Sequence, residues 1–259
     1  KYLISLLSGH IGRANEWCNK LAVRIGAMPV ITTATDARGM FAVDIFSTEH
    51  NMRIVNPVMI KDISGSILNN EPVGITGNDK YKNLLKVTEE RWNGQIKYTD
   101  NSNNEYESGV QIITGKDDKI VFKRTLKLVP QELAVGIGCK KGKSAHEIER
   151  AVKKTFDKAG LLLEAIAVVA SVDRKADEAG IIEFARKCKV PYKTYTPEYL
   201  RDVEGDFVSS AFVEEQIGVG NVCERSAGAA SSGGEKLVGK TADNGVTVAI
   251  YRVAQKNKE

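Results

Sequence analysis

The sequence predicts an α/β protein with two parallel-sheet domains and a β-rich middle segment. Two observations carry this prediction: strand–helix–strand patterns with short connections at both ends of the chain, and a middle rich in Asn and Gly between short β-like runs. Because domains usually comprise about 100–200 residues, a length of 259 residues favours two or three of them. We expect an N-terminal α/β domain over 1–50, a middle domain over 51–130 and a C-terminal α/β domain over 131–259.

The first fifty residues form a predicted strand–helix–strand unit. An apolar strand ends at Leu7, and the turn 8–12 leads into a segment with apolar residues at helical spacing. Gly26 ends this helix, and 29–33 forms the next strand. A right-handed crossover puts the turn at the carboxyl end of a strand, where open α/β sheets bind ligands. The predicted inward face of the helix consists of Ala14, Trp17, Cys18, Leu21, Ala22 and Ile25.

The middle segment alternates short β-like runs with turns. Asn and Gly accumulate at 69–70, 77–79 and 101–104, and they separate runs such as 110–114. This alternation predicts a small, strand-rich domain. Its residues indicate no chemistry, so packing or dimerisation is the role that we expect for it.

The last third of the chain predicts a second α/β domain. A strand over 133–138 enters a turn rich in Gly and Lys, and Ser144 with Glu147 three residues later forms a capping box that starts a helix. Gly160 ends that helix. Further predicted elements are strands over 166–170 and 190–195, helices that start at Thr196 and Asn221, and a hairpin with the turn Asp243-Asn244-Gly245.

Composition argues against several classes of function. Lys and Arg total 37 against 33 Asp and Glu, without a dense basic stripe, so nucleic acid is not an expected partner. No apolar run reaches the roughly 18–20 residues of a membrane span, and we expect no membrane partner. Four cysteines without a short pair are typical of a reduced cytoplasmic protein. With only three histidines, we expect no metal held by protein side chains.

Five strings of the chain match a known pattern: 6–15 and 29–36 in its N-terminal part, and 136–139, 171–175 and 218–253 in its C-terminal part. They resemble the N-terminal signature and the C-terminal domain of the CbiG family, the cobalt-precorrin-5A hydrolases. The resemblance spans essentially the whole chain, although the middle segment matches weakly. The chain departs from the family pattern at Arg13, where the family usually has a second Gly, and it starts within a strand, so we expect an N-terminal piece to be missing.

This resemblance implies an enzyme of anaerobic cobalamin (vitamin B12) biosynthesis. It would open a δ-lactone on a cobalt tetrapyrrole, cobalt-precorrin-5A, and release acetaldehyde. Because the cobalt belongs to the substrate, no cofactor is expected. A homodimer, hand-over to other enzymes of the pathway and a binding cleft between the two end domains are further expectations. The C-terminal domain also occurs as a separate protein in the aerobic pathway, so the N-terminal half carries the hydrolase assignment.

The catalytic residues that the resemblance implies are His10, Lys175 and Glu224. His10 lies in a turn between strand and helix, and an imidazole with a pKa of about 6.5 suits proton transfer at neutral pH; its alternative role is a hydrogen bond within the loop. Lys175 and Glu224 form either a proton-transfer pair, a carboxylate anchor or an internal salt bridge. The expected substrate-binding residues are Ser8, Gly9, Gly12, Asn15, Thr32, Thr33, Thr35, Asp36, Gly138, Cys139 and Lys240.

Two other functions stay open at this point. The first is a corrinoid-binding carrier without catalysis. The second is a nucleotide-dependent enzyme that uses the glycine-rich turn 136–142, although its spacing departs from GxGxxG and no acidic residue ends the second strand. Cys139 in this turn is a candidate nucleophile, but no histidine follows at a recognisable spacing, which favours a structural thiol.

Overall fold

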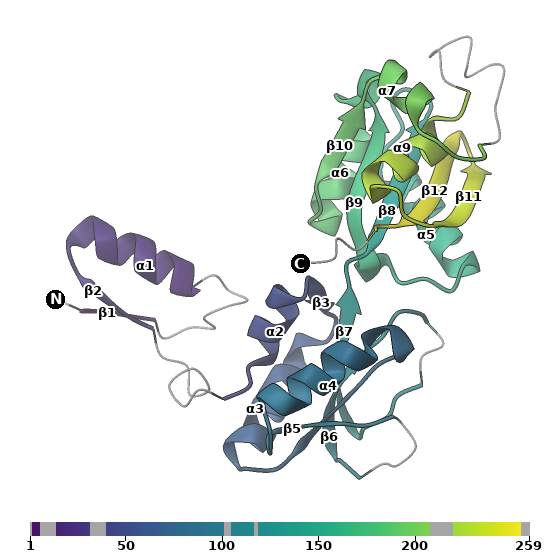
Figure 1. Cartoon of the computed structure of the whole chain (residues 1–259). Helices are drawn as coiled ribbons and strands as arrows, with labels where there is room; N and C mark the ends of the chain where they lie inside the picture. Colours follow the sequence, from purple (N-terminus) through teal and green to yellow (C-terminus); the bar gives the residue numbers. More distant parts are fainter. Residues whose placement is uncertain are drawn as a thin grey trace. The chain divides into compact units, whose positions relative to one another are not determined.

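The computed structural model describes residues 2–5, 14–31, 40–100, 105–116, 119–207 and 220–254 (Figure 1). The chain divides into two compact units, Lys1–Thr114 with Asp118–Pro130, and Gly115–Asp117 with Gln131–Glu259. Each unit contains a five-stranded sheet and helices, so the predicted α/β class is confirmed.

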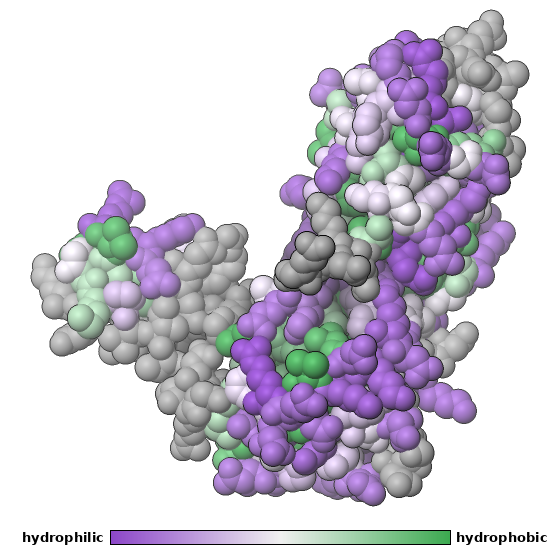
Figure 2. Space-filling view, in the orientation of Figure 1, coloured by the Kyte–Doolittle hydropathy of each residue, from purple (hydrophilic) through white to green (hydrophobic). Residues whose placement is uncertain are grey.

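The first unit begins with the predicted strand–helix–strand pattern. Strand β1 (Tyr2–Ser5) pairs in parallel with β2 (Met28–Ile31), and α1 (Ala14–Ile25) connects them. The predicted apolar face of α1 is only partly covered, because just two of the described strands pair here. Figure 2 shows hydrophobic residues at the surface of this segment. Of that face, Cys18 and Ala22 are buried, whereas Trp17, Leu21 and Ile25 are exposed.

The five-stranded sheet of the first unit has the order β3-β7-β6-β4-β5. All its pairings are parallel except that of β3 with β7. Its core includes Ile63 and Ile67 from α3 and Leu85 from α4, packed with strand residues such as Val110. The elements are α2 (Val43–Glu49), β3 (Met52–Ile54), η2 (Pro57–Met59), α3 (Ile60–Leu68), β4 (Val73–Thr76), η3 (Asp79–Tyr81), α4 (Lys82–Arg91), β5 (Ile96–Tyr98), β6 (Ser108–Ile112) and β7 (Arg124–Pro130).

Helices α3 and α4 make the middle segment more helical than the strand-rich domain that we expected. Both are short, and turns with Asn or Gly flank them. Helix α4 buries only Leu85 and Thr88. Its weak apolar periodicity explains why the sequence pattern does not identify it.

The sheet of the second unit has the order β10-β9-β8-β12-β11. Strands β8 (Leu133–Cys139), β9 (Ile166–Val172) and β10 (Tyr192–Tyr195) run in parallel. Strand β12 (Val246–Arg252) is antiparallel to both β8 and β11 (Lys236–Asp243). The predicted hairpin is present between β11 and β12, where Asn244 and Gly245 have φ angles of 45° and 75°, as a tight hairpin turn requires.

Helix α9 (Val222–Ser231) packs directly on β8 and β9 (Figure 1). Its backbone comes so close to β8 that a Cβ atom on Gly136 would lie 1.8 Å from the carbonyl oxygen of Cys223. Glycine at position 136 therefore permits this approach, which brings the start of α9 to the carboxyl end of β8. The other elements of this unit are α5 (Ala145–Lys158), η4 (Leu163–Ala165), η5 (Asp173–Lys175), α6 (Ala179–Cys188) and α7 (Pro197–Asp202).

Candidate functional site

Five predicted site residues lie in the described part of the second unit. Gly138 and Cys139 end β8, Lys175 follows β9, Glu224 is in the first turn of α9, and Lys240 is in β11. The side chain of Asn15, which is in α1, is not described. The other predicted residues lie outside the described residues, so their roles stay predictions: Ser8, Gly9, His10, Gly12, Thr32, Thr33, Thr35 and Asp36.

Glu178 joins the turn after β8 to the turn after β9. One oxygen of its carboxylate, Oε1, accepts a hydrogen bond of 2.7 Å from the backbone N–H of Gly142. The other, Oε2, accepts one of 2.8 Å from the Lys175 ammonium. This hydrogen bond from Lys175 is the main cause that lowers the pKa of Glu178. Glu178 was not among the predicted site residues, although its spacing of three residues from Lys175 is a recognisable ion-pair signal.

The start of α5 is closed by its own side chains. The predicted capping box is present: Ser144 Oγ accepts from the N–H of Glu147, and Glu147 Oε2 accepts from the N–H of Ser144. Lys143 donates to Glu147 Oε1 at 2.7 Å, which is the main cause that lowers the pKa of Glu147 to about 2. Because protein carboxylates already occupy the amides of Gly142 and Ser144, the glycine-rich turn is a poor phosphate site. This arrangement argues against the nucleotide-dependent alternative.

Cys139 is half-buried at the end of β8. Burial is the largest influence on its thiol and raises the pKa of Cys139 above that of an ordinary thiol, although Lys175 and Lys143 act in the opposite direction. The thiol is therefore protonated at neutral pH and is a weak nucleophile. This state agrees with the structural role that the sequence favours.

Tyr192 and Ser171 hold the adjacent strand ends in place. The hydroxyl of Tyr192 donates to the backbone carbonyl of Lys175 at 2.8 Å, and burial raises the pKa of Tyr192 to about 12. Ser171, which is fully buried, donates to the carbonyl of Ile137 at 2.7 Å. These hydrogen bonds hold in place the backbone at Lys175 and the end of β8 that contains Cys139.

The carboxylate of Glu224 lies against β11. Only 1% of Glu224 is exposed. Its Oε1 accepts a hydrogen bond from the backbone N–H of Lys240, and its Oε2 lies 3.8 Å from the Lys236 ammonium. Lys175 and Glu224, which we expected as a pair, thus have separate partners.

Gly138 and Cys223 have packing roles in this region. A Cβ atom on Gly138 would lie 2.6 Å from Oγ1 of Thr247, which itself donates to the Gly138 carbonyl. Burial raises the pKa of Cys223 to about 11, so this thiol is also protonated at neutral pH. Its Sγ lies 3.4 Å from Oδ1 of Asn221, the residue that caps α9.

The described residues include no group of three or more His, Cys, Asp and Glu side chains that is arranged to hold a metal ion. Among the helices of the described ranges, none is long and apolar enough to cross a membrane.

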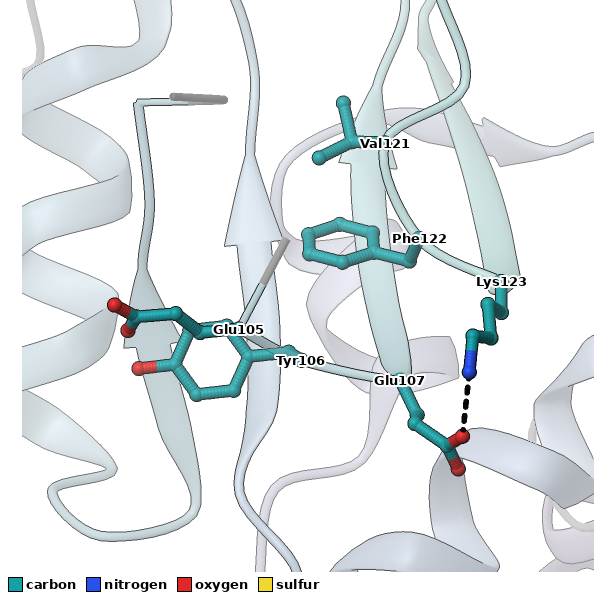
Figure 3. Close-up of a pocket in the computed structure, with 6 residues that line it drawn as sticks. All are labelled: Glu105, Tyr106, Glu107, Val121, Phe122 and Lys123. Atoms are coloured by element: carbon teal, nitrogen blue, oxygen red, sulfur yellow. Dashed lines mark hydrogen bonds and ion pairs between the residues drawn. The ribbon is translucent and has the colours of Figure 1, made fainter. Parts of the chain in front are cut away.

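The first unit contains a pocket of about 300 Å³ just before the starts of β6 and β7 (Figure 3). Phe122 covers the glycines of the sheet here, since a Cβ atom on Gly109 or Gly74 would lie 2.2 Å or 2.5 Å from its ring. Glu107 is paired with Lys123 and Arg124, and its hydrogen bond with Lys123 is the main cause that lowers the pKa of Glu107. None of the predicted site residues that the structure describes lines this pocket, which is formed by Glu105, Tyr106, Glu107, Val121, Phe122 and Lys123.

Comparisons with known proteins find family matches at both ends of the chain. Residues 1–36 match the family model described as Cobalamin synthesis G N-terminal, and residues 133–251 match the one described as Cobalamin synthesis G C-terminus. A cobalt-precorrin-5A hydrolase of Salmonella typhimurium strain LT2 is 32% identical over 253 residues, which are 96% of this chain and 71% of that protein. A probable cobalt-precorrin-5A hydrolase of Methanocaldococcus jannaschii is 30% identical over 264 residues, 96% of this chain and 74% of that protein. Among solved structures, CobE, a protein from the cobalamin biosynthetic pathway, has 29% sequence identity to this chain and a TM-score of 0.45. The match covers 49% of this chain and 94% of the CobE chain.

Proposed function

The chain belongs to the CbiG family of cobalamin-biosynthesis proteins, and from this premise we infer that it is a cobalt-precorrin-5A hydrolase. One observation carries the inference: two relatives that bear this name match 96% of the chain, including both its N-terminal and its C-terminal parts. The match of the N-terminal signature over 1–36 matters most, because the C-terminal domain alone does not imply hydrolysis.

We propose that water attacks the carbonyl carbon of a δ-lactone on the cobalt tetrapyrrole and breaks the acyl–oxygen bond, and that the two-carbon unit then leaves as acetaldehyde. This chemistry needs a group that moves a proton and a group that stabilises the oxyanion of the intermediate. His10 is our candidate for the proton transfer, as the residue of the N-terminal string whose pKa suits it. The cobalt is part of the substrate, so we propose no cofactor for the protein.

Lys175 is our candidate for binding an acid side chain of the substrate. Its side chain is largely buried, and its ammonium donates a hydrogen bond of 2.8 Å to Glu178. Lys175 also follows the carboxyl end of a parallel strand, the edge at which α/β sheets bind ligands. Cys139, at the end of the neighbouring strand, is close enough for the charge of Lys175 to affect its thiol.

Anaerobic incubation with cobalt-precorrin-5A tests the proposed function. We expect acetaldehyde release above a no-protein control, followed with a coupled alcohol dehydrogenase. In the same assay, His10→Ala is expected to lower kcat about 100-fold or more, since general acid–base catalysis contributes about that factor.

Two results would contradict these proposals. Binding of the substrate without release of acetaldehyde would indicate the carrier instead of the hydrolase. Near-normal turnover by His10→Ala would remove His10 from the proton-transfer role while leaving the hydrolase assignment in place.

A further inference from the structure

Glu224 has a buried carboxyl group, and the groups that offset the cost of its burial belong to β11. Burying a carboxylate costs several kcal/mol unless hydrogen bonds and an opposite charge offset the loss of water. Here the backbone N–H of Lys240 donates to one oxygen, and the Lys236 ammonium lies 3.8 Å from the other. With 1% of the residue exposed, the carboxylate is not open to a substrate.

The backbone N–H of Lys240 can donate to Glu224 because the pairing of β11 with β12 is irregular at this point. Val238 pairs with Ile250 and Thr241 pairs with Val248. From the first pair to the second, β11 therefore advances three residues (238 to 241) while β12 advances two (250 to 248). This extra residue is a β-bulge, which leaves backbone groups unpaired in the ladder and re-aims side chains.

The glycine of the bulge makes room for the carboxylate. A Cβ atom on Gly239 would lie 3.2 Å from Oε1 of Glu224, closer than an ordinary contact. The close approach of Glu224 and the bulge at 239–240 thus depend on each other. Without the carboxylate, the Lys240 amide would lose its acceptor inside the protein.

Lys240 is half-buried, as Lys143 and Lys175 are, but its ammonium differs from theirs in its partners. The ammonium groups of Lys143, Lys175 and Lys236 each lie within 4 Å of a carboxylate oxygen. Among the described residues, no carboxylate forms an ion pair with Lys240. A partly buried cation that has no counter-ion among the described residues is suited to bind an anion from outside.

We propose that Glu224 is a positioning residue for Lys240. By accepting the Lys240 N–H, it holds the bulge of β11 and so fixes the ammonium of Lys240, which binds a carboxylate of the substrate. This inference rests on the proposed function, because the acid side chains of the substrate supply the anion. It gives Glu224 an indirect role in place of the direct catalytic role that the sequence suggests.

Steady-state kinetics with a double-mutant cycle test the proposal. Lys240→Met is expected to raise KM about tenfold and to leave kcat within about twofold, as the loss of a binding contact does. Glu224→Ala is expected to raise KM about as much in the wild-type background, but not further in the Lys240→Met background. Glu224→Gln retains an acceptor for the amide, so its KM should stay within about threefold of wild type.

Lys236→Met is the matched control, since it removes a lysine that contacts the same carboxylate through its side chain. Its pair with Glu224 is partly exposed, so we expect KM to change by less than about twofold. The proposal is wrong if Glu224→Gln mainly lowers kcat, which would indicate proton transfer by Glu224 itself. It is also wrong if Glu224→Ala raises KM again in the Lys240→Met background.

Hydrogen exchange of the Lys240 amide gives a readout that does not depend on turnover. In Glu224→Ala this amide is expected to exchange about 10–100 times faster than in wild type, relative to the amide of Ala249 in the sheet, whereas Glu224→Gln should retain most of the protection. Unchanged exchange in Glu224→Ala would overturn the positioning role. If the wild-type protein released no acetaldehyde, the proposed function would fail, while this exchange experiment would still decide the role of Glu224.

Discussion

At the residue scale, three glutamates use their carboxylates to satisfy backbone amides of the second unit. Glu178 accepts from Gly142, Glu147 from Ser144 and Glu224 from Lys240. The amides that could bind the acid groups of a substrate are therefore occupied by the protein itself. We therefore propose that a carboxylate of the substrate binds to side-chain cations such as Lys175 and Lys240 instead.

Gly136 provides a prediction at this scale. We expect Gly136→Ala to lower the free energy of unfolding by about 2–4 kcal/mol, because the new methyl group would lie 1.8 Å from the Cys223 carbonyl oxygen and α9 would have to move. Urea unfolding followed by circular dichroism measures the change. An effect below about 0.5 kcal/mol would show that α9 does not pack on β8 as described.

Gly65 is the matched control for this substitution. It lies inside α3, and a Cβ atom there would meet nothing within 4 Å. Gly65→Ala should therefore raise the free energy of unfolding by about 0.5–1 kcal/mol, the opposite sign.

At the scale of single elements, the turns of the second unit were the most predictable features. The capping box of α5 and the Asn244-Gly245 turn of the hairpin are both present. Each depends on residues close together in sequence, whose turn and cap preferences are strong. Helices α3 and α4 were not predicted, because their burial depends on a sheet assembled from distant strands.

The capping box supports a second prediction. We expect Ser144→Ala to lower the free energy of unfolding by about 1 kcal/mol, since the N–H of Glu147 would lose its acceptor at the start of α5. Chemical denaturation of wild type and variant in parallel gives this difference. His146→Ala, an exposed change in the same turn, should stay within about 0.5 kcal/mol of wild type. Equal effects of the two substitutions would argue against the cap.

At the scale of the whole molecule, several carboxyl groups titrate below their ordinary range because of their partners. The pKa of Glu178 is lowered mainly by Lys175, and that of Glu147 is lowered to about 2 mainly by Lys143. A folded protein whose acids have lowered pKa values binds fewer protons than its unfolded chain. The resulting stability is present above the ordinary pKa of 4.5 and is lost as the pH falls toward about 2.

We therefore expect the free energy of unfolding to decrease between about pH 5 and pH 2. Glu178→Gln should be less stable than wild type at pH 7, and the difference should shrink as the pH falls, because protonation removes the same charge from wild-type Glu178. Denaturant titrations across this pH range measure both trends. A difference that is independent of pH would show that the charge of Glu178 does not contribute.

The sequence by itself determined the α/β class, the strand and the helix of 133–160, the β11–β12 hairpin and the family. These features are local: helical and strand periodicity, caps, turn residues and short matching strings can each be found within a few residues of one another. Only the tertiary structure decided the partners of the candidate site residues. Gly142 and Glu178 are 36 positions apart, and Glu224 and Lys240 are 16 apart. Their contacts depend on sheet order, a β-bulge and the close packing of α9, and no local pattern encodes these.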